Sequence, residues 1–316
     1  MKYKIRIFPI VVILLAGCST GRAPTQVNPI VMDDPPRLHP TTDPASQKGI
    51  PTAAIPTSTA TPKPPLAKEA WMQMPAVPAG VSDPMRAIHR RGLALGSDPR
   101  HFSVIGDCQN VSSYFLSTFD KPGDFSLGEE YAPLQTTIDY YQGSYSRKSL
   151  AVKGGFNVAA VLSPFRADPK SCNLNESPLD CELRLWKPSV VFVSMETWWS
   201  EKPEQEYEKY MRRVIERILE TGAVPILATK ADNLEGDHSI NSTIAQIAYD
   251  YDIPLWNFWA AVQPLDNHGL SPDNFHLTFA RNFFDDPIRM RNAWPWRNLT
   301  ALQSLDVVRR ALADEP

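Results

Sequence analysis

The sequence predicts an α/β domain with a central, mostly parallel sheet and helices on both faces. Four short apolar runs have the length and continuous hydrophobicity of strands buried on both faces, at residues 102–105, 190–195, 224–228 and 254–258. Amphipathic helical patterns separate the later runs. Parallel strands need a crossover that returns the chain to the same end of the sheet, so this alternation is typical of a parallel sheet.

Three helices are expected from apolar residues repeated at helical spacing. Residues 204–221 form the longest pattern, and Gly222 is a suitable stop because glycine readily adopts the left-handed conformation that ends many helices. The other two patterns cover residues 240–251 and 299–312. A weaker strand is expected near residues 150–152.

The N-terminus has the pattern of an export signal. Three basic residues among the first six precede an apolar run at residues 7–15, which is too short to span a bilayer comfortably. The motif Leu-Ala-Gly-Cys that ends at Cys18 resembles a bacterial lipobox, which implies cleavage before Cys18 and lipid on its thiol. Two or three acyl chains hold a protein stably on a membrane. We therefore expect residues 1–18 to be a lipoprotein signal and the protein to be extracytoplasmic and membrane-anchored. The alternative is an ordinary secreted protein or an uncleaved anchor.

Residues 19–71 have the composition of a tether. Proline, threonine, alanine and serine dominate, and no aromatic residue occurs before Trp71. Such a segment cannot bury enough apolar surface to offset the entropy of ordering, so we expect it to be disordered and stiffened by proline. Residues 72–316 are long enough for one α/β domain.

Charge and cysteine content narrow the partners. The formal net charge of −3 gives no basic footprint, so nucleic acid is not expected as a partner. Of the four cysteines, Cys172 and Cys181 are expected to form a disulfide after export, with two free thiols as the alternative. Neither has zinc-ligand spacing around it, and no metal or cofactor is expected. Cys108 is then left outside any disulfide.

Two motifs far apart in the sequence carry the chemistry. Cys108 comes just after the first strand, and Asp273 precedes His276 by three residues near the C-terminus. Sites of parallel sheets form at the carboxyl ends of the strands. A thiol nucleophile, an imidazole base and an orienting carboxylate are the parts needed for acyl transfer. The alternative is a surface turn at the second motif and a small buried side chain at the first.

The order of these motifs resembles the SGNH (GDSL-type) hydrolase superfamily. Gly106-Asp107-Cys108 is similar to the family's Gly-Asp-Ser with cysteine in place of serine, and Asp273-Asn274-Phe275-His276 is similar to its Asp-x-x-His. The resemblance covers residues 102–312 and implies a three-layer α/β/α flavodoxin-like (SGNH-hydrolase-like) fold. It also implies roles for the residues that match: Cys108, Asp273 and His276 as catalytic groups, and the backbone of Gly154 and Gly155 at the oxyanion.

One departure from the family weakens the oxyanion site. Where the family has Gly-x-Asn-Asp, this chain has Glu-Thr-Trp-Trp at residues 196–199, so Trp198 stands in place of the asparagine donor. An indole has a single N–H with a different reach. Losing one oxyanion donor typically costs ~10²–10³ in kcat. Any ester hydrolysis is therefore expected to be slow.

Further polar and aromatic residues should lie at the same rim of the sheet. Candidate substrate contacts are Asp107, Gln109, Thr197, Trp198, Trp199, Lys230, Asp232 and Asn233. The later tryptophans are expected to pack in the core, with a sugar-stacking groove as the alternative: Trp256, Trp259, Trp294 and Trp296.

The leading hypothesis is an envelope-anchored acyl-ester hydrolase or transferase that acts on a glycan or lipid ester. The changed nucleophile and the missing asparagine favour a second hypothesis, a catalytically inactive SGNH-like domain that binds an envelope glycan. The retained Asp273–His276 pair favours the first. A third hypothesis is a thiol-reactive module that uses Cys108.

Overall fold

The computed structural model describes residues 63–195 and 203–313. The chain divides into Met1–Thr59 and Ala60–Pro316, and all described residues belong to the second unit. The expected leader, Cys18 and residues 19–62 of the expected tether lie outside the described residues, as do Thr197, Trp198 and Trp199. Among the described residues, no helix has both the length and the apolar character needed to cross a membrane.

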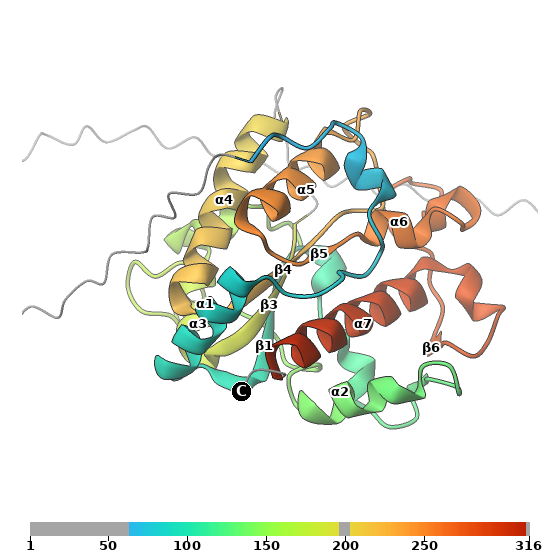
Figure 1. The fold of residues 1–316 in the computed structure, drawn as a ribbon, viewed down its shortest axis with the longest axis horizontal. Coiled ribbons are helices and arrows are strands. Elements are labelled where there is room, and N and C mark those ends of the chain that lie inside the picture. The colour runs from blue at the N-terminus through green and yellow to red at the C-terminus, as the bar shows by residue number, and fades with distance from the viewer. Residues whose placement is uncertain (1–62, 196–202, 314–316) are drawn as a thin grey trace, which may run out of the picture. The chain divides into compact units, whose positions relative to one another are not determined.

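A four-stranded parallel sheet forms the centre of the domain (Figure 1). Its order is β1 (Asp98–Gly106), β3 (Pro188–Ser194), β4 (Val224–Ala228) and β5 (Leu255–Trp256). In register, Phe102 lies opposite Val190, and Val190 lies opposite Val224. All residues of β3 and β4 are buried, as their continuous apolar sequence predicts. The predicted parallel α/β class is confirmed.

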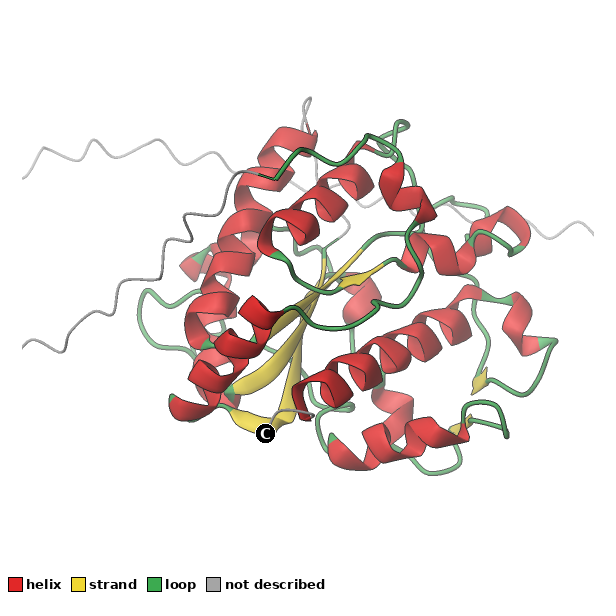
Figure 2. Cartoon of the chain, viewed as in Figure 1, coloured by secondary structure: helices red, strands yellow, loops and turns green. Residues whose placement is uncertain are grey.

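Helices cover both faces of this sheet (Figure 2). α3, α4 and α5 connect successive strands, and α3 and α5 both pack against α4. On the N-terminal helix, the guanidinium of Arg86 donates a hydrogen bond to the carbonyl of Ala311 on the C-terminal helix. The helices are α1 (Asp83–Ala94), α2 (Gln135–Tyr140), α3 (Pro178–Trp186), α4 (Pro203–Thr221), α5 (Ser239–Tyr251), α6 (Phe258–Val262) and α7 (Ala293–Ala313).

Three elements differ from the sequence expectation. The weak strand near residues 150–152 is reduced to one bridge between Gly106 and Val152. The terminal helix begins six residues early, at Ala293 instead of residue 299, because Pro295 sits in its first turn, where its missing N–H costs nothing. A second, two-stranded sheet, β2 (Phe125–Ser126) with β6 (Asn282–Phe283), was not anticipated.

Residues 63–82 form a strap across α5 and the end of β5. Trp71 is 2% exposed, and its ring meets that of Trp259 with centroids 4.9 Å apart. The buried side chain of Asn257 donates from Nδ2 to the carbonyls of Trp71 (2.8 Å) and Met74 (3.0 Å). The stretch 63–71, which the composition assigns to the tether, therefore contacts the folded unit.

Candidate active site

The nucleophile turn is built directly on the end of β1. At Gly106 a Cβ atom would lie 2.3 Å from the side chain of Asn110, so only glycine leaves room for that side chain. Asp107 is fully buried, and its Oδ1 accepts hydrogen bonds from Gln109 N (3.0 Å) and Asn110 Nδ2 (3.4 Å). Cys108 follows as the first residue of a short 3₁₀ helix, half-buried and in no disulfide among the described residues. The buried carboxylate thus shapes the turn that presents the thiol.

Asn110 ties this turn to the neighbouring strand and to α7. Its Nδ2 donates to the carbonyl of Ser194 at the end of β3 (2.7 Å). Its Oδ1 accepts from Nη2 of Arg297 (3.2 Å), which also donates to Ser194 Oγ (2.9 Å). Arg297 is fully buried, with its guanidinium 5.2 Å from the ring centroid of Phe115. Sequence reasoning missed this arginine, because an Arg on a helical pattern is usually exposed.

The base and the acid lie in a second turn. His276 Nδ1 is 2.6 Å from Asp273 Oδ2, and both side chains are more than half exposed. Asp273 Oδ1 also accepts from the backbone N–H of Phe275 (3.0 Å) and His276 (2.9 Å). The hydrogen bond with His276, followed by these two backbone bonds, lowers the pKa of Asp273 to about 2. The carboxylate is therefore ionised at neutral pH and holds one nitrogen of the imidazole.

One hydrogen bond joins the two turns. Gln109 Nε2 donates to the carbonyl of Phe275 at 3.2 Å, and Gln109 is 3% exposed. The residue before Gln109 is Cys108 and the residue after Phe275 is His276, so thiol and imidazole come from adjoining positions of two segments held together. The antiparallel bridge between Leu270 and Leu277 closes the second turn at its base.

A glycine loop runs along the other side of the nucleophile turn. Lys153 N donates to the carbonyl of Gly106 (3.3 Å), and a Cβ built on Gly154 would lie 3.9 Å from the Cβ of Cys108. Gly155 has a φ of +81°, a left-handed conformation that favours glycine. Of the two predicted oxyanion residues, Gly154 is thus placed against the nucleophile. No contact between Gly155 and Cys108 is described.

The polar residues after β4 turn inwards. Lys230 is 2% exposed, and its ammonium contacts Asp232 Oδ1 (2.6 Å) and the carboxylate of Glu235. Asn233 Oδ1 accepts from His238 N (2.8 Å). These side chains hold the loop together, and a substrate contact through Lys230, Asp232 or Asn233 stays a prediction. So does one through Asp107 or Gln109, which are buried in the nucleophile turn.

The tryptophans divide between core and surface. Trp256 is fully buried and donates to Thr300 Oγ1 (2.9 Å), and Trp259 packs on Trp71. Trp296 donates to the carbonyl of Met290 (2.7 Å). Trp294 is 8% exposed and lies near two surface aromatic residues, Tyr114 and Phe279.

A cavity of about 280 Å³ opens beside β1, next to the nucleophile turn. Its lining is largely polar and includes Ser103, Asn110, Ser112, Arg147 and Ser149. Arg147 is ion-paired with the fully buried Glu182 on α3. This positive charge is therefore already neutralised within the protein.

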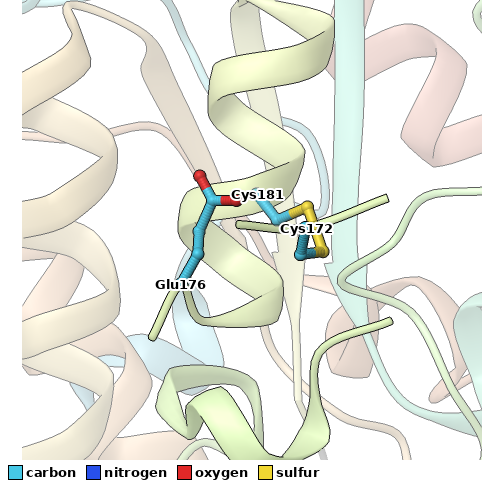
Figure 3. Close-up of side chains that lie close together, drawn as sticks. All are labelled: Cys172, Glu176 and Cys181. Carbon is cyan, nitrogen blue, oxygen red and sulfur yellow. A yellow bond between two sulfur atoms is a disulfide. The ribbon is translucent and has the colours of Figure 1, made fainter. Parts of the chain in front are cut away.

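Away from the site, Cys172 and Cys181 form a disulfide (Figure 3). Glu176 lies beside it and is held by Arg184, whose Nε donates to Glu176 Oε1 at 2.6 Å. Because disulfide sulfurs are not thiolates, this group is not a zinc-type ligand set.

No family model matches the chain, and no curated protein matches it. One similar solved structure is a protein from Desulfitobacterium hafniense DCB-2 provisionally assigned to the lipolytic G-D-S-L family. It has 16% identity and a TM-score of 0.38 over 66% of this chain and 99% of that chain. Another is the acetyl xylan esterase AlAXEase, with 14% identity and a TM-score of 0.37 over 64% of this chain and 96% of that chain.

The first of these structures bears the family name that the sequence motifs resemble. Because both TM-scores are below 0.5, the likeness is not evidence for any residue's role or for a substrate. The α/β fold stands on the chain's own sheet, and the positions of both motifs in it agree with the resemblance to the SGNH hydrolases.

Proposed function

We propose that the domain is an acyl-ester hydrolase or transferase in which Cys108 is the nucleophile, His276 the general base and Asp273 its orienting acid. The observation that carries the proposal is the hydrogen bond from Gln109 to the Phe275 carbonyl, which joins the thiol turn to the imidazole turn. The 2.6 Å contact between Asp273 and His276 supports the assignment of acid and base.

The chemistry proceeds in two halves. His276 Nδ1 faces Asp273, which leaves Nε2 to accept the thiol proton. The thiolate sulfur attacks the ester carbonyl, and the C–O electron pair moves onto the oxygen. When the tetrahedral intermediate collapses, the alkoxide leaves with the proton from His276 and a thioester remains on Cys108. Water, or an acceptor alcohol in a transferase, then attacks the thioester with His276 again as base, and the thiol is restored.

The oxyanion site in this proposal is reduced. The backbone N–H groups of Cys108 and Gly154 are the candidate donors, since the two residues adjoin. Trp198 stands where the family has its asparagine donor. We therefore expect turnover that is slow for an esterase.

The same proposal includes an envelope location and a glycan or lipid ester as substrate. The lipobox-like motif ending at Cys18 supports the location. Metabolic labelling with a fatty-acid analogue is expected to tag the full chain and to fail for the Cys18→Ser variant. Label retained by that variant would contradict lipidation at Cys18.

The rival is a glycan-binding domain without turnover, favoured by Trp198 and by cysteine at the nucleophile position. Hydrolysis of short acyl esters by wild type, Cys108→Ala, Cys108→Ser and His276→Ala separates the two. For a live esterase we expect Cys108→Ala and His276→Ala to lose activity to a similar extent, because nucleophile and base act as one unit. Cys108→Ser should retain or raise it.

Two outcomes of that experiment contradict the mechanism. Turnover that survives Cys108→Ala excludes Cys108 as nucleophile. If neither wild type nor Cys108→Ser hydrolyses any ester while both remain folded by circular dichroism, the domain is a binding module.

A further inference from the structure

Three aromatic side chains stand next to the two proposed catalytic turns. Tyr114 follows Cys108 by six residues, and Phe279 follows His276 by three. The ring centroids of Tyr114 and Phe279 are 6.2 Å apart and their planes are nearly perpendicular, at 84°. Trp294, at the start of α7, lies 5.5 Å from Tyr114 with an interplanar angle of 31°. We call these three residues the aromatic corner.

The two outer rings of the corner are open to solvent. Tyr114 is 51% exposed and Phe279 is 64% exposed, whereas Trp294 is only 8% exposed. Trp294 is therefore a buried support beside Tyr114, and the two other rings offer apolar faces. Large aromatic side chains usually bury most of their surface, so a supported pair left open marks a surface for a ligand.

Tyr114 is held exposed by a rigid backbone. Asn298 on α7 is fully buried, and its Oδ1 accepts from Leu116 N (2.6 Å) while its Nδ2 donates to the carbonyl of Tyr114 (3.1 Å). Leu116 has a φ of 63°, a left-handed conformation that is strained for leucine. Neighbouring structure must impose this conformation, and Asn298 is the group that does so. The exposure of Tyr114 is thus a fixed feature of the fold.

Phe279 is positioned by an equivalent clamp on its preceding residue. Thr278 N donates to the carbonyl of Gly269 (2.8 Å), and Thr278 accepts from Ala293 N at its Oγ1 (2.9 Å) and from Trp294 N at its carbonyl (3.1 Å). The segment that leaves His276 is thereby tied to the start of α7. Both outer rings are held in place without a ligand, which lowers the entropic cost of binding one.

We propose that the aromatic corner is a stacking subsite for a sugar ring, so that the ester substrate carries its acyl group on a carbohydrate. This inference rests on the proposed function, since it names the alcohol part of that ester. A pyranose has one flat face of C–H groups that packs on an aromatic ring, while its hydroxyls remain in water. A flexible acyl chain gains most from walls on several sides, and the corner is open. The nearby cavity that does have walls is lined mainly by polar side chains.

Binding is tested first, in the absence of turnover. Calorimetric titration of the Cys108→Ala protein with unsubstituted xylo-, cello- and chito-oligosaccharides is expected to show binding of at least one series. Tyr114→Ala and Phe279→Ala should each weaken that binding roughly tenfold, about 1.4 kcal/mol. Tyr114→Phe should retain it. Phe165→Ala is the matched control, because Phe165 is 98% exposed and lies outside the corner.

Turnover then separates the subsite from the mechanism. In the wild-type background, Tyr114→Ala should lower kcat/KM roughly tenfold for an acetylated oligosaccharide and leave that for ethyl acetate, which has no sugar, unchanged. If no ester is hydrolysed but oligosaccharide binding still depends on Tyr114 and Phe279, the subsite stands and the esterase proposal fails. Absence of binding by all three series, or binding that ignores both alanine substitutions in proteins of unchanged Tm, overturns the subsite.

Discussion

Asn110 fills the space where a side chain at residue 106 would begin, and this single contact explains the glycine of the first motif. Its amide reaches both Asp107 in the turn and Ser194 on β3. The position of the nucleophile therefore depends on side chains that never meet the substrate. Asp107 belongs to the same group, since its carboxylate is spent on the turn.

At the residue scale, the titration of Asp273 reports the pairing with His276. The pKa of Asp273 is lowered from 3.8 to about 2, and the hydrogen bond with His276 is the largest cause. A folded-state pKa below the unfolded value stabilises the fold above about pH 4, and this contribution is lost as the pH falls towards 2. In His276→Ala the pKa of Asp273 is expected to rise towards 3.8, measured by carbon-13 NMR of the carboxyl group.

Asp286 serves as the internal control for that titration. Desolvation raises its pKa, but hydrogen bonds from Ile288 and Arg289 outweigh this effect and lower it. The substitution touches neither partner, so Asp286 should titrate as before. An unchanged Asp273 would mean that the imidazole is not its main partner.

At the scale of elements, Glu182 connects α3 to β1 and to the loop beside the site. It is fully buried, its Oε2 accepts from Leu150 N (2.9 Å), and its other oxygen contacts Ser103 Oγ and Arg147. Removing one member of a buried pair leaves the other charge uncompensated. Glu182→Ala is therefore expected to lower the free energy of unfolding by about 3–5 kcal/mol, measured by urea denaturation.

Glu208 provides the matched comparison, because its salt bridge to Arg212 is on the surface, with Glu208 43% exposed. Glu208→Ala should change the free energy of unfolding by no more than about 1 kcal/mol. Equal losses for the two variants would show that Glu182 has no special structural weight.

At the scale of the whole molecule, the strap at residues 63–82 completes the core beside α5 and α6. Trp71 fills that space and packs on Trp259. Trp71→Ala is expected to lower the free energy of unfolding by about 3–5 kcal/mol, because a large buried ring leaves a cavity. Gln73, exposed in the same turn, is the control, and Gln73→Ala should stay within about 0.5 kcal/mol of wild type. A similar stability for both variants would mean that the strap is not part of the cooperative unit.

Much of the fold was readable from sequence. The continuous apolar runs predicted all four sheet strands, because strands buried on both faces leave little room for polar side chains. α1 and α3 escaped prediction, although each begins with a serine cap and an early proline: Ser82 before α1, and Ser177 before α3. Both helices are short, and their apolar pattern is interrupted by charged residues.

The candidate site was readable only in its named motifs. The residue types of Cys108, Asp273 and His276 indicated their chemistry because each is a group with few other uses in that order. Their supports were not readable. Arg297 and Asn298 sit on a helix pattern as ordinary polar residues, and only packing places them behind the turns.

The sequence by itself determined the class of the fold, the residues that carry reactive groups and the composition of the N-terminal tether, because these depend on local pattern and residue type. Tertiary structure alone decided which segments meet. The bond from Gln109 to Phe275 and the corner formed by Tyr114 and Phe279 join residues more than 160 positions apart. Such pairings depend on how the strands and helices pack, and nothing in the local sequence of either segment encodes them.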